Sequence, residues 1–139
     1  MILRCSFEEL SALTAGAGRV LDAYATDGRV SAPAEVAATL ETLLPELTGD
    51  LSIGTLEQQQ RLERALEAVL EDVKRRMDEL IIEQHPAAED AVAAYFEYAH
   101  VLTVLDRLRK MGMEMQAIIE LTTGRPADEE MARTVTFPD

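Results

Sequence analysis

The chain has 139 residues and a formal charge of −13, from 26 acidic and 13 basic side chains. A surface with that charge repels nucleic-acid phosphates and anionic lipid, so the composition disfavours nucleic-acid binding and membrane docking. Hydrophobic residues make up 47% of the chain and aromatic residues only 4%. This balance favours a folded, helix-rich domain with an aliphatic core over a β-sandwich or barrel.

A single helical domain is expected over residues 1–139, because this length suits one hydrophobic core and no repeat divides it. The single Cys allows no intrachain disulfide, which suits a reducing compartment. The first residues lack the basic and apolar regions of a signal peptide, and no long uncharged apolar run follows. We therefore expect a cytoplasmic protein without a transmembrane span.

The N-terminal part predicts a short strand and then a helix. Residues 2–5 are mostly apolar and suit an edge strand, and Ser6 and Glu9 have the spacing of a capping box. Apolar residues at spacings of three and four continue the helix for about 18 residues. Gly16 and Gly18 interrupt it, which we attribute to a close helix crossing where a larger side chain would not fit.

A second helix is predicted between Pro33, which suits a first helical turn, and Pro45, which lacks a backbone donor and ends the helix. Four leucine and valine residues give this segment its buried face: Val36, Leu40, Leu43 and Leu47. Residues 49–55 then form a linker. A second capping box, Thr55 with Gln58, begins the next helix.

The strongest pattern is a long amphipathic helix over residues 56–84. Its apolar residues recur at spacings of three and four: Leu62, Leu66, Val69, Val73, Met77 and Leu80. Pro86 then ends this helix and begins another, which we expect to run from 87 to 111 with Gly112 as its C-terminal stop. The short connection makes 56–84 and 87–111 an antiparallel hairpin, the centre of the predicted all-α bundle.

The C-terminal part predicts a short fifth helix over residues 113–122 and a strand over 134–137. A lone strand is unstable in water. We therefore expect residues 134–137 to pair with residues 2–5 or with the same segment of a second copy.

One residue pair resembles part of a metal site, namely Glu97 and His100. The i, i+3 spacing projects both side chains from one helical face, as in the Glu-x-x-His pairs of carboxylate-bridged di-metal bundles. A dimer of the hairpin could then bind iron, manganese or zinc. Against this, the apolar stripe of 56–84 carries no Glu, and Glu97 and His100 share an arc with Glu89 and Arg107 that suits a solvated stripe. The first interpretation is therefore that Glu97 and His100 are solvated or hydrogen-bonded to each other, and metal binding is the alternative interpretation.

The helix over 87–111 is apolar almost all round, which indicates that it is covered on most sides. Its aromatic residues project on different sides, and the predicted interface consists of Tyr95, Phe96, Tyr98 and Leu102. Because the remaining helices are short and broken, we expect the hairpin to associate with itself and form a four-helix dimer core.

The sequence contains no nucleophile elbow, phosphate-binding loop or cysteine cluster, so we predict no catalytic residue and no cofactor. The expected function is that of a non-enzymatic helical protein that acts through protein–protein contacts and self-association, with a dimer favoured. Its acidic charge favours a basic protein as a further partner.

Overall fold

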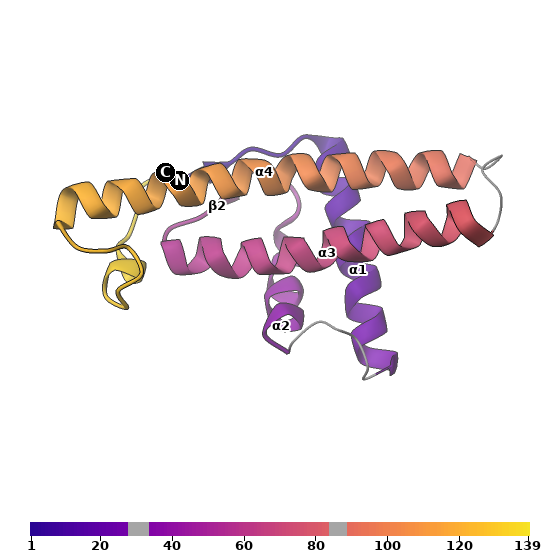
Figure 1. The fold of residues 1–139 in the computed structure, drawn as a ribbon, viewed down its shortest axis with the longest axis horizontal. Coiled ribbons are helices and arrows are strands. Elements are labelled where there is room, and N and C mark those ends of the chain that lie inside the picture. The colour runs from indigo at the N-terminus through magenta and orange to yellow at the C-terminus, as the bar shows by residue number, and fades with distance from the viewer. Residues whose placement is uncertain (28–33, 84–88) are drawn as a thin grey trace.

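The computed structural model describes residues 1–27, 34–83 and 89–139. Its elements, in chain order, are β1 (Ile2–Leu3), α1 (Phe7–Asp27), α2 (Ala34–Leu43), the 3₁₀ turn η1 (Leu44–Glu46), β2 (Leu51–Ser52), α3 (Leu56–Glu83), α4 (Glu89–Thr123) and the 3₁₀ turn η2 (Ala132–Thr134). Helices α3 and α4 lie side by side along the long axis of the molecule, and α1 crosses them (Figure 1). The predicted all-α bundle on an antiparallel hairpin is confirmed.

Helix α1 begins at the predicted capping box. The Ser6 N–H donates to Glu9 Oε1 at 2.8 Å, and the Glu9 N–H donates to Ser6 Oγ at 3.2 Å. Gly16 lies where α1 crosses α3, and a Cβ atom there would be 2.5 Å from Val69 Cγ1. The expected close crossing is thus confirmed at Gly16, whereas a Cβ at Gly18 would meet no atom of the described chain within 4 Å.

Helix α2 buries the predicted face against the rest of the bundle, and Pro45 lies in η1, just after the helix ends. The predicted helix start at Pro33 and the hairpin corner at Pro86 lie outside the described residues. At the start of α3, the Gln58 N–H donates to Thr55 Oγ1 at 3.1 Å, but the Gln58 side chain accepts from the Gly54 N–H. The second capping box is therefore half formed.

The strand pairing differs from the prediction. Strand β1 pairs antiparallel with β2, Ile2 opposite Ser52 and Leu3 opposite Leu51, within the segment expected to be a linker. Residues 134–137 form no strand in this chain and do not pair with residues 2–5, so that predicted pairing is wrong. The alternative pairing, with the same segment of a second copy, stays a prediction. The apolar anchors of the linker explain the difference, because Leu51 and Ile53 are buried and hold this segment beside the N-terminus.

Helix α4 continues through Gly112, where the sequence predicted a stop. Gly112 is buried against α3, and a Cβ there would be 2.5 Å from Gln59 Nε2. The glycine therefore makes room for a buried side chain. The predicted helices 87–111 and 113–122 are a single helix, which ends before Gly124, a residue with a φ of +66°.

The burial of the hairpin decreases along α3 towards the connection between α3 and α4. The apolar stripe of α3 is fully buried from Leu62 to Val73, whereas Met77 and Leu80 are half-buried and Ile82 is 78% exposed. Figure 1 shows that the hairpin extends beyond the point where α1 crosses it. None of the described helices is long and apolar enough to span a membrane.

Candidate functional site

The structure separates the four predicted interface residues into two pairs. The side chains of Tyr95 and Phe96 are exposed, by 58% and 55%. Tyr98 and Leu102 are half-buried, and Tyr98 packs against the core. Of the four predicted interface residues, only Tyr95 and Phe96 are therefore more than half exposed to solvent.

Tyr95 and Phe96 belong to an uncharged surface, which we call the outer face of α4: Val92, Tyr95, Phe96, Ala99 and Thr103. This face lies opposite the side on which Ala94, Val101 and Leu105 are buried. Thr103 Oγ1 donates to the Ala99 carbonyl at 2.8 Å, so its hydroxyl is satisfied within the helix. The outer face can therefore be covered by an apolar surface without leaving this hydroxyl unpaired.

The two rings form an edge-to-face pair, with centroids 5.9 Å apart and an interplanar angle of 71°. Near the described end of α3, Ile81 and Ile82 are 48% and 78% exposed. Large exposed apolar side chains are therefore present on both helices near this end of the hairpin, and we call these residues the hairpin tip: Ile81, Ile82, Val92, Tyr95 and Phe96.

Glu97, the candidate metal ligand, forms ion pairs within the chain. Its Oε1 accepts a hydrogen bond from Arg19 Nη2, and Arg76 Nη1 lies 3.7 Å from its Oε2. Arg19 Nε also donates to Asp72 Oδ2 at 3.2 Å. The predicted solvated position is wrong for Glu97, whose side chain is 14% exposed, because α1 brings Arg19 against this side of α4.

The cluster of Arg19, Asp72 and Glu97 joins α1, α3 and α4 by charge-assisted hydrogen bonds. Burial lowers the pKa of Arg19, but its hydrogen bonds to Glu97 and Asp72 outweigh burial and raise the pKa above its ordinary value.

His100, the second candidate metal ligand, is half-buried. Among the described side chains, no three His, Cys, Asp or Glu residues are grouped so that they could hold a metal ion.

A second buried carboxylate, Glu9 of α1, holds α4 about three turns further along the helix. Glu9 is 3% exposed, and Arg107 Nη1 lies 2.7 Å from each of its carboxylate oxygens. The same Arg107 nitrogen donates to the Arg4 carbonyl at 3.0 Å. Burial raises the pKa of Glu9, but the hydrogen bonds from Arg107 and Ser6 outweigh it and hold the pKa below its ordinary value. Sequence spacing identified Glu9 as a cap but gave no signal for its second partner.

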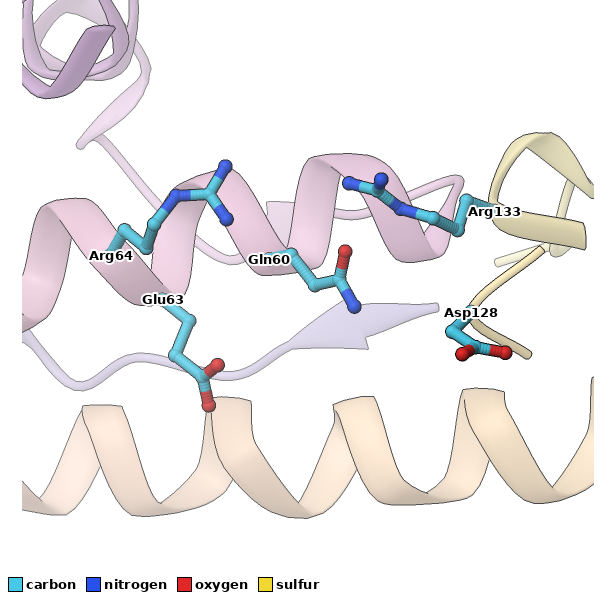
Figure 2. A pocket seen from close by; sticks show the side chains of 5 residues that line it. All are labelled: Gln60, Glu63, Arg64, Asp128 and Arg133. Carbon is cyan, nitrogen blue, oxygen red and sulfur yellow. The ribbon is translucent and has the colours of Figure 1, made fainter. Parts of the chain in front are cut away.

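A shallow polar hollow of about 370 Å³ lies between α3 and the C-terminal segment. Figure 2 shows its lining side chains: Gln60, Glu63, Arg64, Asp128 and Arg133. Two cations and two carboxylates share this space, and Arg64 also pairs with Glu35 at 2.8 Å. Sequence reasoning missed the hollow because its two walls are distant in the chain. Its mixed charge selects no ligand class.

The one thiol of the chain is a weak nucleophile in this fold. Burial, together with the nearby Glu9 and Asp50 carboxylates, raises the pKa of Cys5 to about 11. The thiolate is the reactive form, so Cys5 is almost entirely protonated and unreactive at neutral pH. No protein-family model, curated protein or solved structure matches the chain.

Proposed function

We propose that the protein is a non-enzymatic helical protein that acts through protein–protein contacts and associates with itself through the outer face of α4. The observation that carries this proposal is the exposure of Val92, Tyr95 and Phe96, each more than half accessible on a helix whose opposite side is fully buried. Large aromatic side chains gain substantially from burial and lose little conformational freedom, so they dominate the energetics of many interfaces.

The ion pairs that Arg19 forms next to the outer face of α4 support the proposal. Arg19 of α1 contacts Asp72 of α3 and Glu97 of α4, so the three helices are fixed relative to one another at the turn of α4 that carries the two exposed rings. A rigid surface loses less entropy on binding than a mobile one. The outer face of α4 is therefore preorganised for a partner.

A basic protein is a second candidate partner at the hairpin tip. Residues 77–106 contain seven acidic residues and no Lys or Arg. A different protein that covers the hairpin tip would be favoured if it presented basic residues around an apolar centre, because complementary charge speeds and orients association.

Light scattering after size exclusion tests the self-association. We expect a dimer for the wild type, and a shift towards the mass of one chain, 15.3 kDa, for a Tyr95→Ser, Phe96→Ser double variant. Phe7→Ser is the matched control, because Phe7 is 79% exposed and belongs to α1 rather than to α4. A wild type with the mass of one chain at every concentration, or an unchanged mass in the double variant, contradicts the proposal.

A further inference from the structure

The side of α4 that is not buried extends well beyond the outer face. Positions alternate by four and three residues over about eight turns, and none of their side chains is buried: Val92, Phe96, Ala99, Thr103, Asp106, Lys110, Met113, Ala117 and Glu120. We call this set the outer stripe. Positions at these spacings lie along one side of a helix, where a second helix can pair with it lengthwise, and five of the nine residues are apolar.

We infer that two copies of the chain pair their α4 helices antiparallel along the outer stripe, with the two-fold axis midway between Asp106 and Lys110. The inference rests on the proposed self-association and adds its geometry. In this register Asp106 lies opposite Lys110 of the second copy, and Thr103 lies opposite Met113 of the second copy. Ala99 then faces Ala117 of the second copy, where two small side chains allow close approach of the helices.

The charges of the outer stripe favour this direction over the parallel one. Two parallel helices in register would place Asp106 beside Asp106 and Lys110 beside Lys110, which is repulsive. The antiparallel register forms two opposite-charge pairs around the axis instead. Asp106 is 58% exposed, and its Oδ1 lies 4.0 Å from Arg109 Nη1, so its carboxylate has room for a closer partner.

The same register covers large apolar side chains in the C-terminal half of α4. Met113 is 70% exposed and Leu121 is 85% exposed, although both lie on a long helix beside a well-packed core. Met113 falls opposite Thr103 of the second copy, and Leu121 falls opposite Tyr95 of the second copy. Tyr95 of one chain and Leu121 of the other therefore cover each other, whereas Phe96 falls opposite Glu120 of the second copy.

Site-directed cross-linking tests the register in a Cys5→Ser background, which contains no other cysteine. An Ala99→Cys chain and an Ala117→Cys chain are mixed and treated with a short bismaleimide. We expect a covalent dimer from the mixture and almost none from either chain alone. In a homodimer of the Ala99→Cys chain, the two thiols would be about 18 helical residues apart, or about 27 Å at 1.5 Å per residue.

A charge exchange provides an independent readout by sedimentation equilibrium. Asp106→Lys and Lys110→Asp should each raise the dimer dissociation constant about tenfold or more, because each replaces two attractive contacts with two repulsive ones. The double exchange restores both contacts and should return the constant to within about threefold of the wild type.

The outcomes separate this inference from the proposal beneath it. A wild type that dimerises but gives no cross-link in the mixture, or an Ala99→Cys chain that cross-links efficiently by itself, overturns the antiparallel register and leaves self-association standing. A wild type that remains monomeric overturns both. Cross-linking in the mixture together with rescue by the double exchange supports the register.

Discussion

The contact between Gly112 and Gln59 provides a sharp test of the packing that keeps α4 continuous. Gln59 is 2% exposed, and its Nε2 donates to the Leu108 carbonyl at 2.9 Å. A Cβ at position 112 would lie 2.5 Å from Nε2, 2.6 Å from Cδ and 2.8 Å from Oε1. Gly112→Ala must therefore displace the whole amide group from its hydrogen bond.

The expected effect of Gly112→Ala has two opposing parts. A buried amide that loses its hydrogen bond costs about 1–3 kcal/mol, and crowding of a packed core adds a cost of similar size. Replacing a helical Gly with Ala returns about 1 kcal/mol. We therefore expect Gly112→Ala to lower the free energy of unfolding by about 1–5 kcal/mol.

The sign should reverse when the amide is absent. In a Gln59→Ala background the methyl group introduced by Gly112→Ala has space, so only the helical preference remains, and the substitution should stabilise the chain by about 1 kcal/mol. Urea unfolding of the four proteins in this double-mutant cycle measures both effects. Equal destabilisation by Gly112→Ala in the two backgrounds would refute the packing argument.

Three further predictions concern the buried charges and the thiol. Arg19→Met leaves Asp72 and Glu97 without a shared cation, and should lower the free energy of unfolding by about 1–2 kcal/mol in urea titrations. This loss is smaller than that from breaking a fully buried ion pair, because Arg19 is partly exposed. An unchanged unfolding midpoint would show that the cluster contributes nothing to stability. Folding lowers the pKa of Glu9, so the stabilising effect of the Glu9 carboxylate is present above the ordinary pKa of a glutamate and is lost as the pH falls through the folded value. The loss of stability caused by Glu9→Gln should therefore become smaller between about pH 6 and about pH 3 in thermal melts. A loss of stability that does not change with pH would contradict this prediction. Cys5, with its pKa raised to about 11, should react with iodoacetamide at about pH 8 about tenfold more slowly than in the urea-unfolded chain, and equal rates would be inconsistent with its burial.

The sequence was most informative where local pattern and tertiary packing agree. The spacing of Ser6 and Glu9 identified the start of α1, and the apolar stripe from Leu62 to Val73 identified the buried side of α3. Both features depend on residues three or four positions apart. Such spacings are set by helical geometry alone, so a single sequence is enough to recognise them.

The features that the sequence could not predict depend on contacts between distant segments. Gly112 has the properties of a helix stop, and only the position of Gln59 on α3 shows that it is a packing position. Glu97 looked solvated because Arg19, which neutralises it, is 78 positions away in the chain. Residues 49–55 were predicted to be a linker, and their pairing with the N-terminus was not predicted.

For the candidate interface, the sequence predicted an unusually apolar helix but not which of its sides is free. Tyr98 and Tyr95 are three residues apart and chemically identical, yet one packs against the core and the other is 58% exposed. The difference arises from the rotation of α4 against α3, which the pattern of an almost uniformly apolar helix does not determine.

Hydroxyl-radical footprinting of the wild-type chain at low and high concentration tests self-association through the outer face of α4 most directly. We predict that Tyr95 and Phe96 become protected as the concentration rises, while Phe7, which is 79% exposed on α1, reacts equally at both concentrations. Unchanged reactivity of Tyr95 and Phe96 across the dilution series, or protection of Phe7 in their place, would contradict self-association through this face.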